Sequence, residues 1–190
     1  MSNIDISEQE FIRLAYRRFN EIYKEIMSEK FWAKSDYYRF CLTKDAFMIY
    51  RELIKHKSIE EAFSNLELGM GYSKNSKPVK TTKGLFKIIR HVFAHFPFFT
   101  TWKSAWVSKE IVNWNKRGQQ IDNFFKENEG EEMINYTLTL KNVIIDFEIK
   151  IPNKYTKGEK IFLNEIISEN DGVPFSLDLM KKILDNQIVK

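Results

Sequence analysis

The sequence predicts a mainly α-helical protein with a small C-terminal α+β part that contains a β-hairpin. Apolar residues recur at helical spacing through most of residues 5–115, and they alternate with polar residues from about 133 to 151. The chain has 190 residues, of which 43% are hydrophobic, so it is long enough to bury a core of its own. We therefore expect a helical domain over residues 5–115 and an α+β appendage over residues 116–190.

The first half of the chain carries the clearest helical patterns. Residues 7–10 (Ser-Glu-Gln-Glu) form a capping box, which satisfies the first free N–H groups of a helix. Apolar residues between Phe11 and Ile26 then share one face, which predicts a helix that ends near residue 30. A second helix is expected over residues 43–56, and a short third helix is expected to begin at Ser58.

The last third of the chain changes to a strand-like pattern. Apolar and polar residues alternate over 133–140 and again over 143–151, and the two residues between these runs predict a tight hairpin. A final helix is expected over residues 176–188, after Pro174. A lone hairpin is only marginally stable in water, so this part must pack on the helices, on a third strand or on another subunit.

The stretch from Thr81 to Trp102 predicts an amphipathic helix. Thr81 and Thr82 are suitable N-caps, and Pro97 predicts the end of the helix because the residue before a proline avoids helical angles. At 100° per residue, the apolar side chains gather on one side. These are Leu85, Phe86, Ile88, Ile89, Val92, Phe93 and Phe96. The other side carries Lys83, Lys87, Arg90, His91 and His95.

Basic residues are concentrated around this helix. The window from Leu68 to Lys109 contains eight of the 30 basic residues and none of the 26 acidic ones, so the rest of the chain has more acidic than basic residues. Such a separation indicates an anionic partner, and nucleic-acid phosphates are the natural candidate. Residues 70–80 predict a lysine-rich loop, which is either a solvated connector or a grip on the nucleic-acid backbone. The lysines expected to contact RNA are Lys80, Lys83 and Lys87.

A metal site is not expected near this helix. His91 and His95 have the spacing of two helical metal ligands, but the window contains no carboxylate, and the single cysteine, Cys41, is distant in sequence. Neighbouring lysines would also oppose a divalent cation. The seven glycines form no phosphate-binding loop, so we expect neither a metal nor a cofactor.

The residues IIRHVFAHF resemble the motif of HEPN domains, the helical ribonuclease modules of toxin–antitoxin, CRISPR-associated and phage-defence systems. That motif is an arginine, a polar residue, three to five further residues and a histidine, which Arg90, His91 and His95 match. The resemblance covers about residues 5–115 and implies an up-down helical bundle. One toxin subgroup carries a modified tyrosine two residues after the histidine; this chain has Pro97 there, so that form of control is not expected.

The resemblance implies a metal-independent endoribonuclease, a toxin or a phage-defence effector. In such an enzyme the RNA 2′-hydroxyl attacks the neighbouring phosphorus and leaves a 2′,3′-cyclic phosphate. His95 would transfer protons, Arg90 would stabilise the developing charge, and His91 would orient the phosphate or its neighbouring residue. The resemblance further implies a homodimer, in which two copies of the motif face one cleft, and it admits an antitoxin as a second partner.

Two other functions stay open at the sequence level. The chain could be a non-catalytic HEPN-like module that binds RNA, a nucleotide or a partner protein through the same basic side, or a helical interaction protein in which Arg90 and His95 are incidental. The single cysteine fits a reducing compartment. No apolar run reaches the roughly 18 residues of a membrane span, and the first ten residues have no signal-peptide pattern, so we expect a cytoplasmic protein without membrane contact.

Overall fold

The computed structural model describes residues 6–56, 59, 77–110, 119–129, 134–140, 143–152 and 156–188. In chain order its elements are α1 (Ile6–Ile26), the short 3-10 helix η1 (Glu29–Phe31), α2 (Asp36–Leu53), α4 (Lys77–His95), β1 (Trp106–Val107), α6 (Gln119–Glu127), β2 (Ile134–Leu140), β3 (Val143–Ile149), β4 (Ile161–Phe162), α7 (Leu163–Ile166) and α8 (Gly172–Ile188). The expected mainly helical bundle with a small β-hairpin is confirmed.

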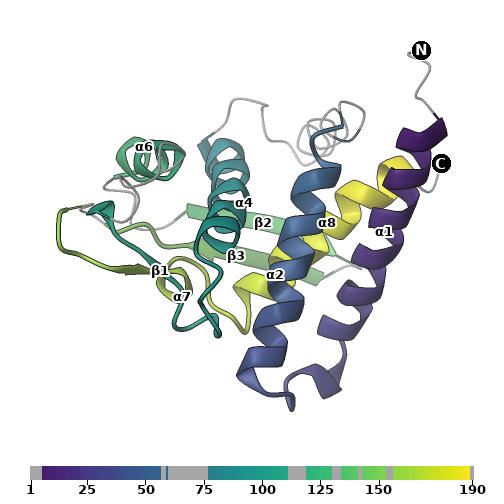
Figure 1. Ribbon diagram of the computed structural model, residues 1–190, viewed down its shortest axis with the longest axis horizontal. Helices are drawn as coiled ribbons and strands as arrows, with labels where there is room; N and C mark the ends of the chain where they lie inside the picture. Colours follow the sequence, from purple (N-terminus) through teal and green to yellow (C-terminus); the bar gives the residue numbers. More distant parts are fainter. Residues whose placement is uncertain are drawn as a thin grey trace.

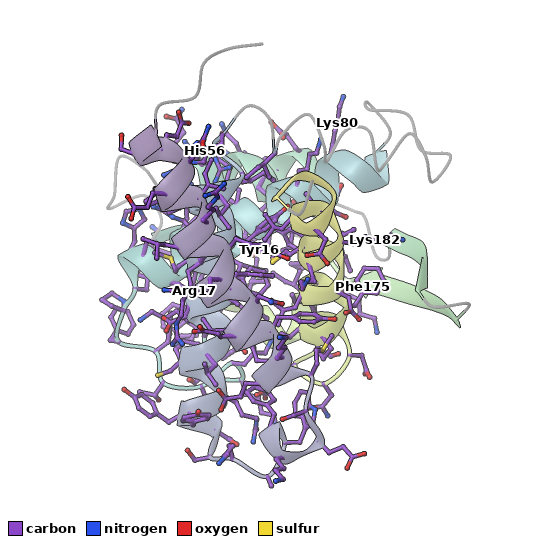
Figure 2. The ribbon with its side chains drawn as sticks, turned by 90° about the vertical axis from the view of Figure 1, so that its right-hand side faces the viewer. Tyr16, Arg17, His56, Lys80, Phe175 and Lys182 are labelled. Carbon is purple, nitrogen blue, oxygen red and sulfur yellow. The ribbon has the colours of Figure 1, made fainter. Side chains whose placement is uncertain are left out.

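Helices α1, α2 and α4 stand side by side, with α8 and the β2–β3 hairpin behind them (Figure 1). Helix α6 packs against α4 on the side away from α2 (Figure 1). Helix α8 packs along α1 (Figure 2). The two helices are antiparallel, as two hydrogen bonds show: Tyr16 donates to Asp185, and Tyr23 donates to Asp178. None of the helices in the described part of the chain is long and apolar enough to cross a membrane.

An aromatic cluster joins α2 to α4. The ring of Phe47 lies 5.8 Å from that of Phe86, 6.3 Å from that of Phe93 and 6.1 Å from that of Trp102, measured between centroids. Trp102 is only 1% exposed, and its indole N–H donates to the carbonyl of Ile167 at 3.0 Å. Because each such ring buries roughly 150–250 Å², this cluster fixes the position of α4 against α2.

The strands follow the expected pattern. Strands β2 and β3 pair antiparallel, with Ile134 opposite Ile149 at the open end and Leu140 opposite Val143 at the turn. The two residues of the turn itself, 141 and 142, lie outside the described residues. The short strand β1 pairs antiparallel with β4.

Several helix ends differ from the sequence prediction. Helix α2 begins at Asp36 and not near residue 43, because the hydroxyl of Ser35 caps it by accepting from the N–H of Tyr38 at 3.3 Å. Helix α8 begins at Gly172, four residues before the predicted start, and places Pro174 in its first turn, where the missing N–H has no helical partner to lose. The short helix expected from Ser58 lies outside the described residues.

Helix α1 buries a narrower apolar face than its sequence predicts. Phe19, Ile22 and Ile26 are fully buried, but Phe11 and Leu14 are about half exposed, at 48% and 49%. Ile12 takes the buried position in this part of the helix. The predicted extension to residue 30 is also wrong, because α1 ends at Ile26 and the chain continues into η1.

The start of α4 requires the largest correction. The helix begins at Lys77, so Lys80 is helical and not part of a loop; residues 70–76 of the expected loop lie outside the described residues. Thr81 and Thr82 are not N-caps but buried interior residues, and the hydroxyl of Thr81 donates to the side-chain oxygen of Asn128 at 2.8 Å. The C-terminal end was predicted correctly: α4 stops at His95, before Pro97.

Candidate functional site

The three residues expected to carry the chemistry lie together in the last turns of α4. Arg90, His91 and His95 are all half-buried on the polar side of this helix. Lys83 and Lys87 precede them on the same side, one helical turn apart from each other. Six of the seven apolar residues predicted for the opposite side are buried, namely Leu85, Phe86, Ile88, Ile89, Val92 and Phe93; Phe96, which follows the end of α4, is only partly buried. The sequence therefore predicted both sides of the helix, but it did not predict how far the polar side is covered.

Arg90 is held by helix α2. One of its terminal nitrogens, Nη2, lies 3.4 Å from the Oε1 of Glu52, which is a long contact for an ion pair. Its Nε is buried and has no hydrogen-bond acceptor among the described residues. Arg90 thus keeps donors that the described part of the fold does not use.

Glu52 keeps its negative charge at neutral pH. A hydrogen bond from Lys55 lowers the pKa of Glu52, partial burial opposes this, and the charges of Lys55 and Arg90 lower it further. The carboxylate therefore neutralises part of the charge on Arg90. Since Glu52 also bonds Lys55 and its side chain is 39% exposed, it can release the arginine at little cost.

His91 is held by helix α6. Its Nε2 donates to the side-chain Oε1 of Gln120 at 2.8 Å, and its Nδ1 is buried without a hydrogen-bond partner among the described residues. Burial lowers the pKa of His91 to about 4; the charges of Arg90, His95 and Lys87 add to this, and the bond to Gln120 opposes it. His91 is therefore a neutral imidazole at physiological pH.

His95 lies one turn after His91, and the two rings are stacked. Their centroids are 5.8 Å apart and their planes differ by only 8°. The Nε2 of His95 is buried. The ring of His95 therefore stacks on the neutral ring of His91, which is hydrogen-bonded to Gln120 of α6.

A cavity of about 200 Å³ lies between α2 and α4, beside this group of residues. Lys83 and Lys87, which were expected to bind RNA, both line it, and Arg51 of α2 joins them. The third expected RNA ligand, Lys80, is exposed, does not line the cavity and points away from the bundle (Figure 2). The structure therefore brings two of the three lysines together and leaves the third apart.

Gly84 sets how closely α6 approaches the polar side of α4. A Cβ atom built at this position would lie 2.8 Å from a ring carbon of Phe124, which is only 5% exposed. Helix α6 buries Phe124, Phe125 and Ile121 on its inner side. This close approach places Gln120 within hydrogen-bonding distance of His91 and explains why the polar side is half-buried.

Comparison with known proteins gives no relative from which a function could be transferred. No protein-family model, curated protein or solved structure matches the chain. Within the part of the chain that the structure describes, no group of three or more His, Cys, Asp or Glu side chains is placed to hold a metal ion. The function is therefore argued from the geometry of this site.

Three residues of the site were missed by sequence reasoning. Glu52 and Gln120 contact the motif from helices that lie 38 and 29 residues away along the chain, and neither belongs to a recognisable pattern. Arg51 sits near the end of a predicted helix that also carries Lys55 and His56, so nothing in the sequence marks it out from ordinary surface charge. Only the packing of α2 and α6 against α4 identifies them.

Proposed function

We propose that this chain is a metal-independent endoribonuclease of the HEPN type, which binds RNA along the polar side of α4. The observation that carries the proposal is the arrangement on one helix: the cations Lys83 and Lys87 lead directly to Arg90 and the stacked histidines. Lysine and arginine attract phosphates by neutralising them and releasing counterions. Arginine and histidine then supply the two kinds of group that RNA cleavage needs.

The proposed reaction is an attack within the RNA itself. The 2′-oxygen forms a bond to the neighbouring phosphorus, and the bond from phosphorus to the 5′-oxygen breaks. The proton of the 2′-hydroxyl passes to a base, and the departing 5′-oxygen receives a proton from an acid. The products are a 2′,3′-cyclic phosphate and a 5′-hydroxyl. Arg90 stabilises the extra negative charge on the phosphoryl oxygens through its fork of donors.

This reaction requires both an acid and a base, and one chain has few candidates. His91 is neutral near pH 7 and its Nε2 is engaged by Gln120, so it positions His95 and does not supply a proton. The proposal therefore includes a homodimer in which His95 of one copy acts as base and His95 of the other as acid. It also includes a cytoplasmic setting, a role as a toxin or phage-defence effector, and an antitoxin that restrains it.

The test is cleavage of a labelled RNA by the purified protein in excess EDTA. We expect cleavage by the wild type and a loss of about 100-fold or more in the His95→Ala variant, the range of general acid–base catalysis. A His56→Ala variant is the matched control, because the ring of His56 is bonded to Glu8 of α1 and not to the motif on α4; Figure 2 shows His56 beside α1. Undiminished cleavage by His95→Ala would remove the assigned role of His95.

A second candidate function is RNA binding without cleavage, and one observation favours it. The Nε of Arg90, the Nδ1 of His91 and the Nε2 of His95 are all buried in the single chain. A phosphate reaches these atoms only if α6 or a side chain moves. This candidate predicts RNA binding that weakens with salt, yields no products in the same assay, and is weakened when Lys83, Lys87 or Arg90 is replaced.

A further inference from the structure

We infer that the cavity between α2 and α4 binds a single nucleotide unit, with its phosphate at the cations and its base or sugar against the apolar wall. The inference rests on the proposed function, since it assigns a position to one nucleotide of the bound RNA. The inference extends the proposed RNA-binding site by this cavity and by three residues of the α2 region outside the motif, Tyr50, Arg51 and Ile54.

The charge around the cavity favours an anion. Arg51, Lys83 and Lys87 line it, and none of the described lining residues is acidic. Glu52, which follows Arg51 in the sequence, forms its ion pairs with Lys55 and Arg90 instead. Three half-buried cations around one cavity attract an anion, and a bound phosphate would accept hydrogen bonds from them.

The remaining surface of the cavity distinguishes a nucleotide from a bare phosphate. Tyr50 and Phe86 are 2% and 4% exposed, and their rings meet edge to face with centroids 6.0 Å apart. Ile54 adds an aliphatic surface beside them. Inorganic phosphate would contact none of these groups favourably, whereas a base or a ribose would bury the surface of Ile54 and the small part of the two rings that stays exposed.

The size of the cavity limits the ligand. Its volume of about 200 Å³ is smaller than the roughly 300–1,000 Å³ of pockets for drug-sized ligands. The cavity can therefore enclose no more than one nucleotide unit, and a dinucleotide cofactor does not fit.

The cavity and the catalytic motif share the same helix. Lys87 lines the cavity, and its charge also acts on His91. Arg90 follows Lys87 by three residues, a rise of about 4.5 Å along α4. A strand whose nucleotide sits in the cavity would therefore continue toward Arg90, and the cavity would select the nucleotide next to the cleaved bond.

Calorimetric titration tests the inference. The probes are adenosine 5′-monophosphate, uridine 5′-monophosphate, adenosine, inorganic phosphate and a short 2′-O-methyl oligonucleotide that cannot be cleaved. We expect either the mononucleotides or the oligonucleotide to bind at least about tenfold more tightly than phosphate or adenosine. Binding of the mononucleotides would assign the cavity to a free nucleotide as well, and binding of the oligonucleotide alone would assign it to RNA.

Two variants address different properties of the cavity. Arg51→Gln removes a charge, and Ile54→Trp fills the space without changing charge; each should weaken binding by about tenfold or more. Lys24→Gln, which removes a charge from an exposed position on α1, should bind as the wild type does. Thermal melts establish that each variant is folded, and Arg51→Gln remains informative if Ile54→Trp is not.

The outcomes separate this inference from the proposed function when RNA cleavage is measured on the same samples. If no nucleotide probe binds better than phosphate, or if both cavity variants bind as the wild type does, the cavity is not a nucleotide site. Nucleotide binding that both variants weaken, in a protein that cleaves no RNA, supports the cavity and rejects the nuclease. Cleavage and binding that neither variant alters support the nuclease and reject the cavity.

Discussion

Arg39 and Arg90 show two uses of a partly buried arginine in one chain. The Nε of Arg39 donates to Glu169 at 3.0 Å and its Nη2 donates to Asp36 at 2.7 Å. Its Nη1 donates to a backbone carbonyl at 2.7 Å. Arg90, by contrast, has one 3.4 Å contact with Glu52, and its Nε has no acceptor among the described residues.

The difference separates a structural group from a candidate functional one. Every nitrogen of the Arg39 guanidinium has an acceptor, and hydrogen bonding to Glu169 raises its pKa, so it ties the start of α2 to the segment before α8. The Nε of Arg90 has no acceptor among the described residues. Its partner Glu52 has a side chain that is 39% exposed and also pairs with Lys55. A planar guanidinium with donors to spare suits a phosphate, which accepts two parallel hydrogen bonds.

The largest effect on stability is expected at Arg39. The Arg39→Gln variant leaves the carboxylate of Glu169, whose side chain is only 8% exposed, without its cation, and this should lower the free energy of unfolding by about 3 kcal/mol. Urea unfolding followed by circular dichroism measures this loss. RNA binding by the folded variant should be unchanged. A loss below about 1 kcal/mol, the value for an exposed ion pair, would show that this pair is not structural.

The opposite pattern is expected at Arg90. The Arg90→Gln variant should lower the rate of RNA cleavage by about 100-fold, as removal of one charge-stabilising donor does in other enzymes. Its free energy of unfolding should change by less than about 1 kcal/mol, since the partner Glu52 is partly exposed. Arg17→Gln on α1 is the matched control for charge (Figure 2). Equal cleavage by the wild type and Arg90→Gln would make Arg90 a second structural arginine.

The smallest effect is a pH dependence at His91. Burial lowers its pKa from 6.5 to about 4, so between these two values the unfolded chain binds a proton that the folded chain does not. Folding is therefore stabilised by the neutral ring above pH 6.5, and this contribution is lost as the pH falls toward 4. The stability difference between the wild type and His91→Gln should thus decrease by about 1 kcal/mol from pH 7 to pH 4, with partial exposure allowed for.

Urea unfolding of both proteins across this pH range measures the effect. The pair of proteins is needed because both contain the same carboxylates, whose contributions to the pH dependence cancel in the difference. Parallel stability curves would mean that His91 is solvated and that α6 does not cover it.

The helical periodicity of α4 allowed both of its sides to be predicted, because the aromatic core selects one side of a regular helix. The same periodicity could not reveal its start. Thr81 and Thr82 are residue types that cap helices, yet here they are buried within α4, and Thr81 bonds Asn128 near the end of α6. The tertiary contact outweighs the local preference.

The partners of the candidate site could not be predicted for a related reason. Glu52, Gln120 and Arg51 reach α4 from other helices, and their positions depend on how α2 and α6 pack. A hydrophobic pattern along one helix does not tell which neighbouring helix it covers. The half-burial of Arg90 and the lowered pKa of His91 both follow from this packing.

Helix α6 lies close to α4 at Gly84, because the side chain of glycine is a single hydrogen atom and leaves room for the ring of Phe124. This close packing limits the access of solvent to His91. A methyl group in place of that hydrogen atom would meet the aromatic ring at 2.8 Å, well inside ordinary contact distance. The ring of Phe124 would have to move away, and helix α6, which carries both Phe124 and Gln120, would move with it. The burial of His91 therefore depends on a residue about two turns earlier in α4 that takes part in no chemistry.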